Sequence, residues 1–437
     1  MFVARPTEMN FQGNEQRPLL GENLYSSVPW AEDHRWWVRM PAQQIVMAKF
    51  TFHHLISTVW KDFTWALLIS LPFALLAVPL RWDSRWVFGL NYFALIALES
   101  RFISTAEWIW LFSDSTVTTI VAEALPHIFP LIVGITAIVH EEITLVQSFI
   151  IGSLIANLLM GTGLSWFVGG LRFREQKAHT TAMKSIVSLT MITVFPFIPP
   201  MFIGPLYEAF PQSTALFTLT VAEVIVMLVI YAMWLCFRYN SHAALFEELE
   251  ETDAGSTADD GSPTSGAVNG RFSGQEELST ASRLNYAFRL IAILVLEIQC
   301  SVYLIQDIPR FVQDTSLSHI FIGAALLPFT SSLSSFAKTC AIAYDDRMEL
   351  AMHLTAETAL GVGLFNLPIL IIASVCIGHR MLLDFDLLLE VYLFITAVTT
   401  AFTTGYGLFT YLKGAIHLGL YVPPPAPNDL GFIRLTQ

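Results

Sequence analysis

The sequence predicts an all-α integral membrane protein with about 10–11 transmembrane helices, and three observations support this fold class. First, 54% of the 437 residues are hydrophobic and only 14% are charged, which leaves too little polar surface for a water-soluble globular protein. Second, apolar runs repeatedly reach the roughly 20 residues that a helix needs to cross the hydrocarbon core. Third, one acidic stretch divides these runs into two groups.

Each apolar run is bounded by charged residues, Gly or Pro, as expected of membrane helices joined by short loops. The first group comprises 63–80, 86–104, 116–139, 147–171, 184–206 and 214–237. The second group comprises 285–306, 318–344, 349–378 and 386–406. An eleventh run, 409–422, is too short to span an ordinary bilayer, so the side on which the C-terminus lies stays open.

The composition outside these runs predicts the domain organisation. The net charge of −13 arises largely in one stretch that is nearly free of aliphatic residues, which is typical of a solvated linker. The predicted parts are a disordered cytosolic N-terminal tail without a signal peptide (1–45), the first helix with a first group of five (55–237), an acidic disordered linker (238–283), a second group (284–422) and a Pro-rich C-terminal tail (423–437).

Two further features bear on topology and chemistry. Basic residues precede the first helix and fill the turn after the fourth, which includes Arg172, Arg174 and Lys177, so both are expected in the cytosol, together with the linker. The four cysteines lie in or beside apolar runs, which favours packing roles over disulfides or a metal cage. Phosphate loops, catalytic triads and zinc spacings are missing from the sequence, so an enzyme is not expected.

Several segments resemble the calcium/proton exchangers, the cation/proton antiporters of the calcium/cation antiporter superfamily. The stretch "SFIIGSLIANLLMGTGLSWFVGGLRFREQ" at 148–176 is similar to the G-S-x-L-S-N helix of that family. "WVFGLNYFALIALESRFISTAEW" at 86–108, "FIGAALLPF" at 321–329 and "MELAMHLTAETALGVGLFNLPIL" at 348–370 match further family helices. The resemblance extends over roughly residues 55–420.

This resemblance implies two inverted five-helix repeats plus one N-terminal helix, with an ion site at mid-membrane. It implies cation/proton antiport across an endomembrane, most simply that of the vacuole, without a cofactor. The partners would be membrane lipid, the transported proton and a cation such as calcium, but no nucleic acid, and a homo-oligomer stays open.

The family motif G-N-x-x-E, which occurs once in each repeat and carries the ion-binding carboxylate, is degenerate in both copies. The first copy falls on Pro126 (Gly), His127 (Asn) and Pro130 (Glu), and the second falls on Ser331, Ser332 and Ser335. The partner motif G-S-x-x-Q begins at Glu357 and places Gly361 at the Gln. Ser153 and Asn157 are the motif residues that survive.

Glu123 and Glu357, about one helical turn from the lost positions, are the best acidic replacements for the missing carboxylates, and His127 and Lys338 are further candidates for the transport site. His127 could titrate near neutral pH, although a lone membrane histidine is more often a hydrogen-bonding packing residue. Pro126 and Pro130 should break the helix locally. Lys338 lies in the middle of the eighth run, where it would either stand in for a bound cation, paired with Glu357 or Glu123, or extend to the interface. Other acidic residues in or near apolar runs are assigned mainly to helix ends or structural hydrogen bonds: Glu99, Glu107, Glu223, Glu297 and Glu390.

Three functions remain open at this level, and no metal-ligand set can be assigned. The leading interpretation is a divergent exchanger with altered or reduced calcium activity. The alternatives are a non-transporting protein with a regulatory or partner-binding role, and proton-coupled transport of a monovalent or anionic solute. A cavity lined by polar candidates would favour transport, whereas a core filled by Phe129, Phe329 and Phe336 would favour the non-transporting class.

Overall fold

The computed structural model describes residues 60, 62–110, 124–178, 180–199, 202, 214–241, 280–315 and 317–421, and the structural statements that follow concern these residues. They belong to one compact unit, His53–Gln437. The tails predicted at 1–45 and 423–437 lie outside the described residues.

Seven helical segments are long and apolar enough to cross a membrane: Ser84–Ala106, Ile143–Arg172, Leu216–Asn240, Leu284–Thr315, His319–Tyr344, Met348–Ile377 and Leu387–Thr404. Three shorter apolar helices accompany them: Asp62–Ala77, Leu125–Val139 and Met183–Phe197. These segments coincide in order with the ten longer apolar runs. The predicted all-α membrane class is therefore confirmed.

The first half of the described chain is helical between short loops. Its elements are α2 (Ser70–Ala77), α3 (Ser84–Trp110), η3 (Leu125–His127), α5 (Ile128–Val139), α6 (Ile143–Ile155), η4 (Ala156–Gly161), α7 (Thr162–Arg172), β1 (Gln176–Lys177), α8 (Thr180–Val194), η5 (Phe195–Phe197), α10 (Thr214–Cys236) and η6 (Phe237–Ser241).

The second half continues in the same manner. Its elements are α12 (Thr280–Thr315), α13 (His319–Phe321), η7 (Ile322–Leu326), α14 (Leu327–Tyr344), α15 (Met348–Gly361), η8 (Val362–Asn366), α16 (Leu367–Ile377), α17 (Leu387–Thr404), β2 (Leu408–Phe409) and α18 (Tyr411–Leu420). Helices η6 and α12 extend into both ends of the range predicted as a disordered linker, whose central part lies outside the described residues.

Three long helices change to π-helical geometry partway along their length. Segment η4 separates α6 from α7, η7 precedes α14, and η8 separates α15 from α16. A π-helical turn leaves backbone carbonyls without their usual partners and often marks a functional site. The carbonyl oxygen of Leu158 in η4 accepts hydrogen bonds from the hydroxyls of Thr162 and, at 3.2 Å, Thr400, so this freed group is satisfied inside the bundle.

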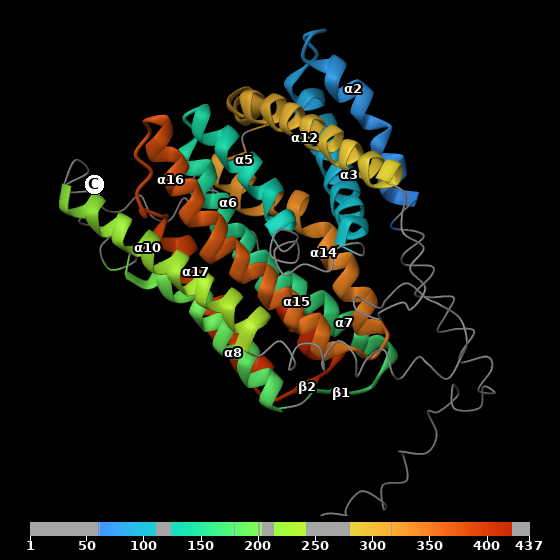
Figure 1. The fold of residues 1–437 in the computed structure, drawn as a ribbon, viewed down its shortest axis with the longest axis vertical. Coiled ribbons are helices and arrows are strands. Elements are labelled where there is room, and N and C mark those ends of the chain that lie inside the picture. Colours follow the sequence, from blue (N-terminus) through green and yellow to red (C-terminus); the bar gives the residue numbers. More distant parts are fainter. Residues whose placement is uncertain are drawn as a thin grey trace, which may run out of the picture. The chain divides into compact units, whose positions relative to one another are not determined.

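Helices from the two halves of the chain pack directly on each other. Helix α12 lies alongside α3 (Figure 1), and α6 crosses η7 at very short range. A Cβ added to Gly152 would lie 2.3 Å from the carbonyl oxygen of Ala324, and one added to Gly323 would lie 2.8 Å from Cβ of Ser148. Small residues allow such close backbone contact in membranes, where van der Waals packing replaces the hydrophobic effect between helices.

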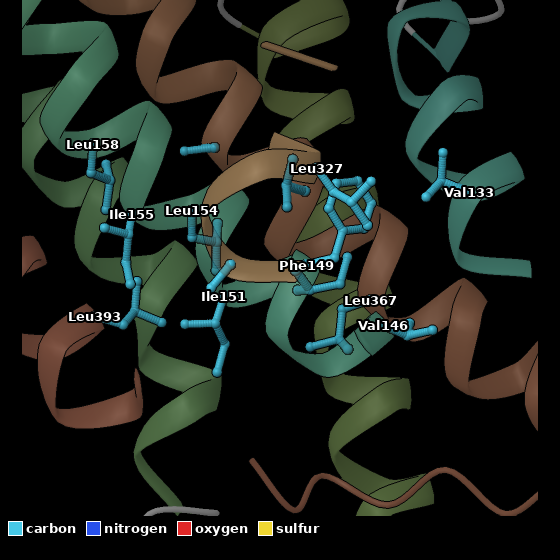
Figure 2. Packing of buried hydrophobic residues seen from close by; sticks show 14 of the residues in the cluster. Val133, Val146, Phe149, Ile151, Leu154, Ile155, Leu158, Leu327, Leu367 and Leu393 are labelled. Carbon is cyan, nitrogen blue, oxygen red and sulfur yellow. The ribbon is translucent and has the colours of Figure 1, made fainter. Parts of the chain in front are cut away.

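The buried core surrounds α6. Side chains of α6 such as Phe149 and Ile155 meet Leu327, Leu367 and Leu393, which come from α14, α16 and α17 (Figure 2). Near one end of the bundle, β1 pairs with β2 in an antiparallel manner, with Gln176 opposite Phe409, and links the segment after α7 to the start of α18. The core thus fixes the helix that carries Ser153 and Asn157 against the second half of the chain.

Candidate functional site

Asn157 and Ser332 meet in the core although 175 residues separate them. The Asn157 side-chain amide donates to the backbone carbonyl of Ser153 at 2.8 Å and approaches the Ser332 hydroxyl at 3.5 Å. Asn157 is 1% exposed and Ser332 is 3% exposed. The first copy of the surviving motif therefore contacts the degenerate second copy of G-N-x-x-E, as expected if the two halves form one site.

The Ser153 hydroxyl lies on the same helix, one turn before Asn157, since residues i and i+4 share a helix face. It is buried and its oxygen has no hydrogen-bond partner among the described residues. In η8 the side-chain amide of Asn366 is likewise fully buried with neither its nitrogen nor its oxygen paired. Sequence reasoning missed Asn366, although an Asn inside an apolar run was the available signal. Buried polar groups without partners usually need a functional explanation.

Pro126 and Pro130 shape the start of α5. Pro126 lies in the 3₁₀ turn η3, and Pro130 is the third residue of α5, which follows that turn directly. The prolines therefore produce a change from 3₁₀ to α geometry, in agreement with the predicted local break.

His127 fills the space left by the lost Gln of the partner motif. A Cβ built on Gly361 would lie 1.9 Å from Cε1 and 2.1 Å from Nε2 of the His127 ring. The ring is 5% exposed and also contacts the ring of Phe365, with 5.8 Å between centroids. The two degenerate positions are thus complementary in shape, because a side chain at residue 361 would exclude the imidazole.

The second degenerate motif lies along α14. The hydroxyl of Ser331 donates to the carbonyl of Pro328 at 3.0 Å, and Ser335 is half-buried one turn later. Ser335 carries no charge at the position where the family has Glu. This copy of the motif therefore offers hydroxyl oxygens but no carboxylate.

The pairing predicted between Glu357 and Lys338 is wrong. Glu357 on α15 forms an ion pair with Arg238 of η6 and lies 3.7 Å from Nδ1 of His353. The reason is geometric: η6 extends α10 toward α15, so the guanidinium reaches a carboxylate that is 7% exposed. The other predicted partner, Glu123, lies outside the described residues.

Lys338 instead interacts electrostatically with Glu99 of α3, which also interacts with Glu297 of α12. Glu99 is 1% exposed and Glu297 is 0% exposed, and both oxygens of each carboxylate lack a hydrogen-bond partner among the described residues. These two residues therefore depart from the role at helix ends or in structural hydrogen bonds that was predicted for most acids in the apolar runs. Their shared location could not be read from the sequence, because it depends on how α3, α12 and α14 pack.

The core contains both kinds of side chain that were expected to distinguish transport from its loss. Phe129 and Phe336 are buried, and Phe329 contacts the ring of Tyr421 edge-on, while Asn157 and Ser332 meet nearby. Neither an entirely polar nor an entirely aromatic arrangement is observed. Within the described part of the chain, no group of three or more His, Cys, Asp or Glu residues could hold a metal ion.

Comparison with known proteins identifies relatives of this chain. The family model for sodium/calcium exchanger protein matches residues 84–240 and 285–423. The "vacuolar calcium ion transporter" of Schizosaccharomyces pombe is 25% identical over 81% of this chain and 82% of its own length. The "vacuolar cation/proton exchanger 1a" of Oryza sativa subsp. japonica is 28% identical over 81% of this chain and 76% of its own length.

Solved structures show the same fold. The structure of native YfkE has a TM-score of 0.66 at 18% identity and covers 82% of this chain and 97% of YfkE. The crystal structure of the H⁺/Ca²⁺ exchanger CAX has a TM-score of 0.57 at 13% identity and covers 84% of this chain and 89% of that protein. Because the family model matches both helical halves on either side of the linker, this chain belongs to the sodium/calcium exchanger protein family.

Proposed function

We propose that this chain is a cation/proton antiporter of the vacuolar membrane with reduced calcium activity. The observation that carries the proposal is the contact between Asn157 and Ser332 across the two halves, at the positions where the family motifs meet. The names of the relatives, a vacuolar calcium ion transporter and a vacuolar cation/proton exchanger, supply the cation, the proton and the compartment.

The arrangement of the π-helical segments supports two related repeats. Segment η4 begins at Ala156, four residues after Gly152, and η8 begins at Val362, five residues after Glu357, the matching position of the second motif. The interruption thus occurs at nearly the same point of both motifs. In inverted repeats such broken helices meet at mid-membrane and form the ion site. We place Ser153, Asn157 and Ser332 at this site.

These residues bind a cation through neutral oxygens. The amide oxygen of Asn157 and the hydroxyls of Ser153 and Ser332 are the hard ligands that Ca²⁺ and alkali ions accept. The positions of the two family carboxylates hold Pro130 and Ser335, so a divalent ion here would lack the negative charge that offsets its dehydration. Reduced affinity for calcium follows from this loss of charge.

The test is cation-driven proton movement in liposomes that contain the purified protein and an internal pH dye. The unmodified protein should release protons when a cation is added outside, and Asn157→Ala should lower the initial rate at least tenfold. Asn91→Ala is the matched control, because Asn91 is also buried and its amide donates to a carbonyl four residues earlier, at 2.8 Å, while its side chain makes no hydrogen bond to the second half among the described residues.

A second comparison tests the reduced calcium activity. Radioactive calcium uptake driven by a proton gradient should be weak in the unmodified protein and should rise when Pro130→Glu and Ser335→Glu are combined, but not with the uncharged pair Pro130→Gln and Ser335→Gln. If no added cation causes proton release from liposomes with the folded, unmodified protein, the proposed antiport is contradicted. Strong calcium uptake by the unmodified protein would contradict its reduced calcium activity.

A further inference from the structure

We propose that Glu99, Glu297 and Lys338 form a second ion site, which exchanges one proton for one monovalent cation. This inference deepens the proposed cation/proton antiport and rests on it. The three residues lie on α3, α12 and α14, none of which carries the surviving family motif. Glu99 interacts electrostatically with both of the other residues.

Both carboxylates are unusually placed for structural residues. Glu99 and Glu297 lie in the interior of long helices that pack against each other, and all four carboxylate oxygens are buried without a hydrogen-bond partner in the described chain. A buried charge is normally paired and hydrogen-bonded, because desolvation without such partners is costly. Carboxylates in this state are suited to hold a proton or an ion.

An independent observation also points to a ligand. The hydroxyl of Ser301, four residues after Glu297 and therefore on the same face of α12, is 0% exposed and has no hydrogen-bond partner among the described residues. The site thus combines two carboxylates with a neutral oxygen donor, a set of hard oxygen ligands that suits alkali cations as well as protons.

Lys338 places a positive charge near Glu99. An ammonium group there repels a divalent cation more strongly than a monovalent one, which favours monovalent ligands at the carboxylates.

Charge counting assigns the ligand class. With one proton on the carboxyl pair and a protonated Lys338, the site is neutral, which a low-dielectric interior favours. When this proton leaves to water and a monovalent cation binds between the carboxylates, the net charge of the site stays at zero. A divalent cation would leave an uncompensated positive charge unless Lys338 also lost its proton.

Two thiols lie close to these groups: Cys300 beside Glu297, and Cys340 two residues after Lys338 on α14. Several charged groups of the surrounding helices are engaged elsewhere. Asp307 on α12 accepts a hydrogen bond from Ser84 at 2.7 Å, near the opposite end of α3. Arg101 donates to Thr64 at 2.7 Å, and His127 packs on Gly361. The charge balance of the site is therefore set by the two glutamates and the lysine.

The first experiment uses the liposome assay with Na⁺, K⁺ or Ca²⁺ added outside acid-loaded vesicles. Monovalent cations should drive proton release from the unmodified protein, and Glu99→Gln or Glu297→Gln should lower this rate at least tenfold. Lys338→Gln should raise the ratio of Ca²⁺-driven to Na⁺-driven rates at least tenfold. Glu390→Gln is the matched control, since Glu390 is 4% exposed but lies on α17.

The second experiment does not require transport, so its failure can be told apart from failure of the proposed antiport. Infrared difference spectra of the purified, full-length protein should show a carboxylic-acid C=O band that disappears when Na⁺ or K⁺ is added. Glu99→Gln or Glu297→Gln should remove this band while leaving the thermal unfolding midpoint within the range of Glu390→Gln. A band that is insensitive to monovalent cations, or that persists in both variants, would overturn the proposal even if antiport is observed.

Discussion

The contact between His127 and Gly361 allows a sharp test of the packing at the degenerate motifs. Gly361→Ala would place a methyl group 1.9 Å from Cε1 of the imidazole, far inside van der Waals contact. The ring is 5% exposed and contacts Phe365, so it cannot turn into open space. Overpacking of this kind costs about 1–3 kcal/mol, whereas replacing Gly by Ala inside a helix gains about 0.5–1 kcal/mol. The net destabilisation should therefore be about 1–2 kcal/mol.

The assay is a denaturant titration of the purified protein in detergent, which measures its free energy of unfolding. Gly89→Ala is the matched control, because Gly89 lies inside α3 and a Cβ there would have no atom within 4 Å. This variant should be neutral or slightly stabilised. His127→Ala combined with Gly361→Ala should recover most of the loss, since the clash is removed. The reasoning is refuted if Gly361→Ala is as stable as Gly89→Ala, or if the double variant is no better than Gly361→Ala alone.

Three further outcomes follow from other contacts. Gly152→Ala should destabilise the protein by about 3 kcal/mol or prevent folding, because its methyl group would meet the backbone of Ala324, which cannot turn aside; expression and size-exclusion profiles would show this. Glu357→Gln should cost about 3 kcal/mol, because the Arg238 charge loses this partner. Adding Arg238→Gln should restore stability in the same denaturant titration, and a double variant no more stable than Glu357→Gln would contradict the ion pair. Burial lowers the pKa of His417 from 6.5, against the hydrogen bond with Lys413 that raises it, so the unfolded state binds more protons between the two values. Stability should therefore fall as pH decreases through about 6.5 and level off below the folded-state pKa, and His417→Phe should flatten this dependence.

The sequence carried enough information for the membrane class and for the assignment of Asn157 and Ser332 to family motifs in the two halves of the chain. Uninterrupted apolar runs leave little freedom in what they form, because only a helix satisfies its own backbone inside a bilayer. The motif alignment placed Asn157 in one half and Ser332 in the other, but their contact is seen only in the structure.

Contacts between helices without a shared motif could not be predicted in this way. The complementarity of His127 and Gly361 was hidden because each was read as the loss of a family residue, and only the packing of α15 against the start of α5 shows that one accommodates the other. Glu99 and Glu297 were visible as acids in apolar runs, but their common location depends on the rotation of α3 relative to α12. Hydrophobic periodicity does not define that rotation when a helix is apolar on nearly every side.

The crossing of α6 and η7 has a mechanical consequence. Gly152 touches the backbone of Ala324, and Gly323 touches Leu145 and Ser148, so each helix has a notch that receives the other. The small residues permit close backbone contact at this point only. Sliding along either helix axis would therefore drive a neighbouring side chain into the backbone of the other helix. The crossing therefore holds the two halves of the chain in register along both helix axes.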